Sequence, residues 1–264
     1  MNILEGHSNG IRCLEKIDEN RFASGSADET IKIWDAKNLV CVKTLFTDQH
    51  NGSLCLRSMA INRLASGSEN GDIKIWDIKS GLCLLTLNTH ANVVYDIVFL
   101  PNGHLVSCSL DKDIKVWTLD RGECLKILKG HSSVVKCLVL LNNGQLASGS
   151  EDYTIKLWNI ESGECVKTLK GHSRYIRRLL ELENSELISC SLDSTIKIWD
   201  LKKGVCIKTL FGHTYWVMSM KLNKQNNTLI SCSYNGTIKI WLLTTGKCIN
   251  TINSNEPFKH SILI

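Results

Sequence analysis

Proline is scarce in this sequence, and long hydrophobic runs are absent. Only two prolines, Pro101 and Pro257, occur among 264 residues, and no low-complexity linker divides the chain. No apolar stretch is long enough to cross a membrane, and the opening residues MNILEGHSNG lack the apolar core of a signal peptide. We therefore expect a cytoplasmic or nuclear protein with no membrane partner.

A concentration of positive charge is also missing. The net charge of +5 is spread along the chain without a basic run, which argues against nucleic acid as the main partner. The hydrophobic share of 43% is ordinary for a globular protein, and the length allows a sizeable core.

The twelve cysteines contain no C-x-x-C pair, so the usual zinc and thioredoxin spacings are excluded. We expect no metal and no cofactor. Half of the cysteines each lie seven residues after a tryptophan, and the others fall in apolar, strand-like runs. A residue type repeated once per structural unit indicates a packing role, so we predict reduced thiols that act as small buried hydrophobic groups.

The chain repeats itself at a period of 41 or 42 residues, which must be interpreted before any local motif. The repeated tryptophans are Trp34, Trp76, Trp117, Trp158, Trp199 and Trp241. The histidines that accompany them are His7, His50, His90, His131, His172 and His213.

Each unit contains four short runs typical of strands. In residues 130–170 these are VVKCLVLL, QLASGS, TIKLW and ECVKTL, separated by Gly, Asn and Asp. Five units have a glycine five residues after the tryptophan, where a turn requires a positive φ, and the first unit has Asn38 and Leu39 there, of which we expect Asn38 to adopt that conformation. We predict one domain, residues 1–252, with units at 4–46, 47–88, 89–129, 130–170, 171–211 and 212–252.

The predicted fold class is all-β, with six four-stranded antiparallel blades in a propeller. A single sheet of this size is apolar on both faces, and radial stacking covers each face with the next sheet. The chain resembles the WD-repeat family, whose Trp-Asp pair is intact at Trp34, Trp76 and Trp199. Because seven blades are usual in that family, an open arc of an incomplete seven-bladed propeller is the alternative. The tail, residues 253–264, contains a segment at 258–264 that would begin the inner strand of a further blade.

The resemblance implies a hydrogen-bonded tetrad of His, Ser, Asp and Trp in each unit. Such sets are His131, Ser148, Asp152 and Trp158 in one unit, and His172, Ser189, Asp193 and Trp199 in the next. Ser, His and Asp together also suggest nucleophilic catalysis. An active site is a single feature, however, and these sets recur, so we predict a structural role, no catalytic residue and no enzyme. Asn70 and Asn235 replace the Asp in two units, where an amide is expected to accept the same hydrogen bond.

Function is expected in the residues that the units do not share. The resemblance implies that three positions per unit face partners: three and five residues after the His, and the residue before the turn Asp. Aromatic and cationic side chains at or beside these positions are typical interface anchors, although they also fit ordinary exposed side chains. The candidates are Arg12, Tyr95, Lys136, Arg174, Tyr175, Arg177, Arg178, Trp216 and Tyr234.

These residues predict a non-catalytic scaffold that binds partner proteins or peptides on the narrow face of the propeller. The stretch SGECVKTLKGH is similar to the propellers of F-box ubiquitin-ligase receptors. The alternative is therefore recognition of phosphorylated or acidic motifs as a substrate-receptor module of a ubiquitin ligase, because arginine forks bind carboxylates and phosphates.

Overall fold

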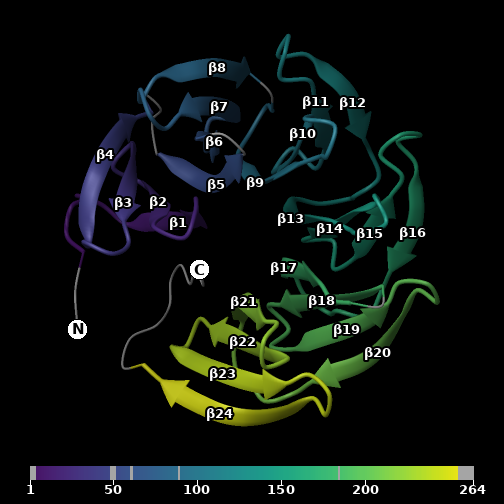
Figure 1. Ribbon diagram of the computed structural model, residues 1–264. Coiled ribbons are helices and arrows are strands. Elements are labelled where there is room, and N and C mark those ends of the chain that lie inside the picture. The colour runs from purple at the N-terminus through teal and green to yellow at the C-terminus, as the bar shows by residue number, and fades with distance from the viewer. Residues whose placement is uncertain (1–3, 48–51, 60–61, 89, 184, 255–264) are drawn as a thin grey trace. The chain divides into compact units, whose positions relative to one another are not determined.

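The computed structural model describes residues 4–47, 52–59, 62–88, 90–183 and 185–254, which form strands and turns (Figure 1). Within these residues there is no helix, and hence no helix that could cross a membrane. The strands build six four-stranded antiparallel sheets, here numbered blades 1 to 6 in chain order. The chain divides into two compact units between residues 127 and 128. His50 and the predicted strand at 258–264 lie outside the described residues.

The first unit contains blades 1 to 3, and in each blade the strands lie side by side in chain order. Blade 1 consists of β1 (Ile11–Lys16), β2 (Arg21–Ser26), β3 (Thr30–Asp35) and β4 (Val40–Phe46). Blade 2 consists of β5 (Ser53–Met59), β6 (Arg63–Ser68), β7 (Asp72–Asp77) and β8 (Cys83–Asn88). Blade 3 consists of β9 (Val94–Phe99), β10 (Leu105–Ser109), β11 (Ile114–Trp117) and β12 (Cys124–Leu128).

The second unit contains blades 4 to 6 with the same strand order. Blade 4 consists of β13 (Val135–Leu140), β14 (Leu146–Ser150), β15 (Ile155–Trp158) and β16 (Cys165–Leu169). Blade 5 consists of β17 (Ile176–Glu181), β18 (Glu186–Ser191), β19 (Ile196–Asp200) and β20 (Val205–Leu210). Blade 6 consists of β21 (Val217–Asn223), β22 (Thr228–Ser233), β23 (Thr237–Leu242) and β24 (Lys247–Asn253).

Burial within a blade follows the position of the strand. In blade 4 the second strand, LASGS, is buried at every residue, which fits its small and apolar side chains. The third strand alternates, with Ile155 and Leu157 buried and Lys156 half-buried between them. The fourth strand is exposed except near its end, where Leu169 is buried. Blade 4 thus has a buried second strand and a solvated outer edge.

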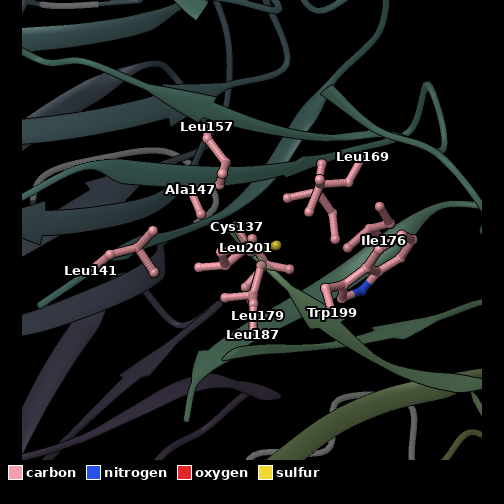
Figure 2. Close-up of a cluster of buried hydrophobic side chains, with 11 residues drawn as sticks. Cys137, Leu141, Ala147, Leu157, Leu169, Ile176, Leu179, Leu187, Trp199 and Leu201 are labelled. Atoms are coloured by element: carbon pink, nitrogen blue, oxygen red, sulfur yellow. The ribbon is translucent and has the colours of Figure 1, made fainter. Parts of the chain in front are cut away.

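Neighbouring blades of one unit cover each other's faces. Figure 2 shows this packing between blades 4 and 5: Ala147, Leu157 and Leu169 of blade 4 lie in one buried cluster with residues of blade 5. Those partners include Ile176 and Trp199. Blades 5 and 6 pack in the same way, as do blades 2 and 3. This face-to-face stacking of small sheets confirms the predicted propeller architecture.

The predicted turn glycines all have positive φ, but in blade 1 the prediction for Asn38 is wrong. The residue with positive φ there is Leu39, at 58°, while the Asn38 amide donates to Asp35 Oδ2 at 2.9 Å. In blade 2 the glycine has a second role, because a Cβ at Gly81 would lie 2.9 Å from Cε of Lys43. That lysine crosses from blade 1 and donates to two turn carbonyls of blade 2, and Lys167 and Lys208 repeat this link in the second unit.

Each blade has one buried cysteine, which in blades 1, 2, 4 and 5 lies on the face that meets the next blade of the same unit. In blades 1, 2 and 4 this cysteine is on the first strand and pairs with a glycine of the second strand, as Cys137 pairs with Gly149. In blades 3, 5 and 6 the cysteine is on the second strand instead, as at Cys190. Burial raises the pKa of the Cys13 and Cys190 thiols to about 12, so these groups remain protonated.

The prediction that all twelve cysteines are buried is wrong for the outer strands. Their side chains lie on the solvated edge, where each thiol donates to the carbonyl two residues further on, as Cys165 does to Lys167 at 3.4 Å. The cysteines concerned are Cys41, Cys83, Cys124, Cys165 and Cys248, which are exposed, and Cys206, which is half-buried. All twelve are free thiols.

We expect Gly149→Ala to destabilise the protein by about 1–3 kcal/mol, because overpacking a core strains it by this amount. A Cβ at Gly149 would lie 2.6 Å from Ile176 Cγ2 of the next blade and 2.7 Å from Cys137 Sγ. Gly10→Ala is the matched control, since no atom lies within 4 Å of its Cβ position. Urea titrations measure both free energies of unfolding, and equal values would contradict the tight packing.

Thiol labelling should divide the cysteines into two sets. In the folded protein we expect a maleimide to modify up to six sites, those on the outer strands, and to spare Cys13, Cys55, Cys108, Cys137, Cys190 and Cys232. In denaturant all twelve should react. Intact-mass spectrometry counts the added groups, and labelling of the buried set without unfolding would show that the blade faces are open.

Candidate functional site

The four tetrad residues of blade 4 are joined by a chain of hydrogen bonds. The Trp158 indole N–H donates to Ser148 Oγ at 2.8 Å, and Ser148 Oγ lies 2.7 Å from His131 Nε2. His131 Nδ1 lies 2.8 Å from Asp152 Oδ2. The carboxylate only accepts, so Nδ1 carries the proton, and the serine hydroxyl donates to the unprotonated Nε2.

Blades 1, 3 and 5 contain the same chain of hydrogen bonds. In blade 5 the distances are 2.8 Å from Trp199 to Ser189, 2.7 Å from Ser189 to His172, and 2.6 Å from His172 to Asp193. The corresponding residues are His7, Ser24, Asp28 and Trp34 in blade 1. In blade 3 they are His90, Ser107, Asp111 and Trp117. In blade 2 the described part of the set is the bond of 2.9 Å from Trp76 to Ser66.

The serine of each tetrad is engaged on both sides and shielded from solvent. Ser148 and Ser189 have no exposed surface, so a substrate does not reach Oγ without unfolding the blade. Burial alone would raise the pKa of Asp152 and Asp193, but hydrogen bonds from the histidine and a threonine hold it well below its usual range. The carboxylates therefore stay ionised and fix the histidines in place. This arrangement stabilises a turn and has no open position for a reacting group.

Blade 6 departs from the pattern because Asn235 does not bond to His213, so the predicted substitution of amide for carboxylate is wrong there. The Asn235 carbonyl oxygen accepts from Thr237, and its amide N–H donates to Thr214 Oγ1 at 3.1 Å. His213 Nδ1 instead lies 3.3 Å from Thr237 Oγ1. Burial, with the nearby Lys239 charge, lowers the pKa of His213 to about 4.

We expect the wild-type protein to lose stability in mild acid, and we expect Asn235→Asp to remove this loss. His213 has a pKa of 6.5 when unfolded and about 4 when folded, so the unfolded chain binds more protons as the pH falls from 6.5 to 4. The free energy of unfolding should fall by about 3 kcal/mol across this window. A carboxylate at position 235 would accept from Nδ1, raise the histidine pKa and flatten the decrease. Denaturant titrations between pH 4 and 7 measure the free energy of unfolding of both proteins.

The control for this pH series is Asn250→Asp, which places the same new charge on the exposed outer strand of the same blade. Its profile should keep the wild-type slope. An unchanged slope in Asn235→Asp as well would contradict the assignment of the loss to His213.

In blades 1 and 3 to 6 the three predicted partner positions gather at one end of the blade. In blade 5 the N–H of Leu192, before the turn Asp, donates to the carbonyl of Tyr175, three residues after the His, at 2.9 Å. In blade 6 Tyr234 donates to Trp216 in the same way. The remaining position, five residues after the His, is a β-bulge, occupied by Arg12, Tyr95, Lys136, Arg177 and Met218. A bulge directs its side chain away from the regular ladder.

In blade 2 the positions counted from His50 are displaced by one residue from the β-bulge. The bulge lies at Leu54, between the paired residues Ser53 and Cys55. Counting from the histidine gives Ser53 and Cys55 for these positions, but both are buried. The pairing of Cys55 with Gly67 aligns blade 2 with blades 1 and 4 and shows that the cysteine is the better marker.

The cations at the bulges differ in their partners. Arg12 forms an ion pair with Glu69 of blade 2, and Lys136 lies 3.0 Å from Glu151 of its own blade. Both carboxylates stand directly before the turn residue. Beside Arg177, the residue directly before the turn residue is uncharged: it is Leu192 in the same blade and Tyr234 in the next blade. The Arg177 Nε is a buried donor without a hydrogen-bond partner in the described structure.

Aromatic rings surround this end of blades 4 to 6. Tyr153 stacks on Tyr175 with ring centroids 5.9 Å apart. In blade 6 Tyr215, Trp216 and Tyr234 contact one another at 4.9 to 5.7 Å. Tyr153, Tyr175 and Tyr215 are each about 40% exposed. Three rings in mutual contact, with Tyr215 exposed and Trp216 and Tyr234 half-buried, are suited to hold an extended peptide.

Sequence reasoning missed Tyr153 and Tyr215. Tyr153 follows the turn Asp at a position of positive φ, where the other blades have Glu, Gly, Lys or Ser, and no packing requirement explains a ring there. Comparison of this position among the units would have identified it. Tyr215 directly precedes Trp216, and this adjacency is the signal that could have identified it.

Three predicted residues, Arg178, Tyr95 and Arg12, do not belong to this aromatic end. Arg178 pairs with Cys190, at the register position where blades 1, 2 and 4 place their buried cysteines, so it belongs to the face toward blade 6. Tyr95 is half-buried and, with Arg12, belongs to the first unit. We call the residues that the second unit gathers at the loop ends, namely Tyr153, Arg174, Tyr175, Arg177, Tyr215, Trp216 and Tyr234, the aromatic–arginine surface. No group of metal-ligating side chains occurs among the described residues.

Four-stranded antiparallel blades that cover each other face to face, with a His–Ser–Trp hydrogen bond in each fully described set, define a β-propeller protein of the repeat type. The family model of the WD domain, G-beta repeat, matches residues 1–35, 39–77, 81–118, 122–159, 163–200 and 204–241. The chain therefore belongs to the WD40 repeat family.

Individual relatives are similar over about one repeat. The probable E3 ubiquitin ligase complex SCF subunit scon-2 of Neurospora crassa is 47% identical over 45 residues, which is 17% of this chain and 7% of that protein. The probable SCF subunit sconB of Arthroderma benhamiae is 49% identical over 43 residues, 16% of this chain and 6% of that protein. The matched stretches thus span less than a tenth of these relatives.

Proposed function

We propose that this protein is a non-catalytic scaffold that binds a partner protein through the aromatic–arginine surface at the loop ends of blades 4 to 6. The observation that carries the proposal is Arg177, whose Nε donor is buried and has no hydrogen-bond partner among the described residues, while Tyr175 and Trp216 stand in the neighbouring loops. A buried donor without an acceptor costs free energy, and a bound ligand that supplies an acceptor recovers it.

The composition of this surface supports a protein partner. Tyrosine, tryptophan and arginine are the residues that most often dominate binding energy at interfaces, because they combine large contact areas with hydrogen-bonding groups. Membership of the WD40 family fits an interaction scaffold. The repeated tetrads supply no alternative active site, since each described serine is buried and bonded.

The chemistry of the surface favours an acidic or phosphorylated peptide. Glu69 and Glu151 offset the charges of Arg12 and Lys136, whereas no ion pair is found for Arg174 or Arg177 in the described residues. A carboxylate or phosphate beside the aromatic rings would meet the planar fork of Arg177. The partial similarity to SCF subunits is consistent with a role as a substrate receptor of a ubiquitin ligase, which we propose as the second candidate.

Peptide binding tests the proposal. A library of extended peptides, each in unmodified, acidic and phosphorylated form, is screened by fluorescence anisotropy. We expect Trp216→Ala and Arg177→Glu each to weaken binding at least tenfold, since hot-spot residues contribute about 2 kcal/mol or more. Only Arg177→Glu should abolish the preference for the anionic forms.

Lys224→Glu is the charge-matched control, because Lys224 is exposed in the loop between β21 and β22, and it should bind as the wild type does. Equal affinity of Arg177→Glu and wild type for every peptide would exclude this surface as the binding site. Loss of affinity in Trp216→Ala alone would retain the scaffold role and reject the anionic ligand.

A further inference from the structure

The residues that follow His213 in blade 6 lack hydrogen bonds that hold the corresponding residues of blade 5. In blade 5 the Ser173 N–H donates to Asp193 Oδ2 at 3.1 Å. One position further on, the Arg174 carbonyl accepts from the Ser191 hydroxyl at 3.0 Å. Both residues are thus tied to the end of β18 and to the turn after it.

Blades 1 and 4, which also have an aspartate in this turn, contain the same two bonds. Their lengths are 2.9 to 3.2 Å. The donors and acceptors are Ser8 to Asp28 and Ser26 to Asn9 in blade 1, and Ser132 to Asp152 and Ser150 to Ser133 in blade 4. The pair of bonds is therefore a repeated way of fixing the segment after the histidine.

Blade 6 has neither bond, although all the residues concerned are described in the structure. Asn235 stands in place of the aspartate and binds the Thr214 hydroxyl instead of the Thr214 N–H. The Ser233 hydroxyl, which corresponds to that of Ser191, is buried and has no hydrogen-bond partner among the described residues, so it does not hold the Tyr215 carbonyl. A buried hydroxyl without a partner is unfavourable, which indicates that this turn is not closed as in the other blades.

The open turn carries three side chains of the aromatic–arginine surface. Tyr215 and Trp216 lie within it, and Tyr234 directly precedes Asn235. The three rings contact one another at 4.9 to 5.7 Å. The bond that remains is the one from the Tyr234 N–H to the Trp216 carbonyl, at 2.9 Å. A segment with few backbone hydrogen bonds opens more readily than its neighbours.

We propose that Asn235 is a positioning residue, which leaves residues 214–216 unlocked so that their aromatic rings adapt to the bound peptide. This inference rests on the proposed function and adds that the partner orders the turn when it binds. An aspartate at this position would accept from His213 Nδ1 and from the Thr214 N–H, as Asp193 does from its own partners in blade 5. The blade would then fix the rings before the partner arrives, which lowers affinity for a peptide that the open turn selects.

Amide hydrogen exchange of the full chain measures the state of the turn. In the wild type we expect exchange at the Thr214 amide to be at least tenfold faster than at the hydrogen-bonded Ser173 amide. Asn235→Asp should slow exchange at Thr214 at least tenfold. Asn250→Asp, which adds the same charge on the exposed outer strand of this blade, should not change it.

Fluorescence anisotropy with the tightest-binding peptide of the library measures the effect on binding. We expect Asn235→Asp to bind about tenfold more weakly although it is more stable to denaturant, and Asn250→Asp to bind as the wild type does. A merely structural role would move stability and affinity in the same direction. The titrations are made at low and high salt, because salt screens repulsion between a new carboxylate and an anionic peptide but does not reopen the turn. The loss in Asn235→Asp should persist at high salt.

Asn235→Ala separates closure of the turn from loss of the amide, because it removes the amide without supplying an acceptor. It should leave Thr214 exchange fast and bind more tightly than Asn235→Asp. Equal affinities of these two variants would overturn the proposal.

Three further results would overturn it. They are unchanged Thr214 exchange in Asn235→Asp, affinity in that variant equal to or higher than the wild-type value, and a loss of affinity that disappears at high salt. Absence of peptide binding by the wild type would reject the proposed function together with this role of Asn235. Normal wild-type binding with unchanged affinity in Asn235→Asp would reject this inference alone.

Discussion

Burial of the sheet faces between neighbouring blades of one unit is the interaction on which this structure depends. A blade such as blade 4 has a second strand that is buried at every residue, and no side chain of that strand remains for solvent. The faces are also matched at the level of single atoms, since Gly149 leaves room for both Cys137 and Ile176. Apolar area removed from water in this way stabilises each contact, and the lysine that crosses to the next turn fixes the outer edges.

Much of the architecture follows from periodicity, because the requirement to cover a face repeats in every unit. The strands, their order and the turns with positive φ were predictable from short apolar runs separated by Gly, Asn and Asp. The errors arise where one residue deviates from its copies. Leu39 rather than Asn38 adopts the positive φ of its turn, and the amide of Asn235 donates to Thr214 Oγ1 instead of accepting from the histidine. Neither outcome follows from composition alone, because each depends on which atom faces which.

The candidate site was only partly predictable for the same reason. Position in the repeat placed Tyr175, Trp216 and Tyr234 at one end of their blades. The difference among Arg12, Lys136 and Arg177 came from residues elsewhere in the repeat, which are glutamates in two cases and Leu192 and Tyr234 in the third. A repeated fold thus tolerates variation at its loop ends, and the electrostatic character of each cation is set by a neighbour some 15 or more positions away in the chain.

The near-equivalence of the blade faces has a consequence for the ancestry of the gene. The face that blade 4 presents to blade 5 is chemically close to the one that blade 5 presents to blade 6, and each has one buried cysteine, on the first strand in blade 4 and on the second strand in blade 5. An unequal recombination event that inserts or deletes one period would therefore join compatible surfaces at once. Such a chain changes its blade number without needing compensating substitutions in the core, while the unrepeated loop residues are shuffled into new combinations.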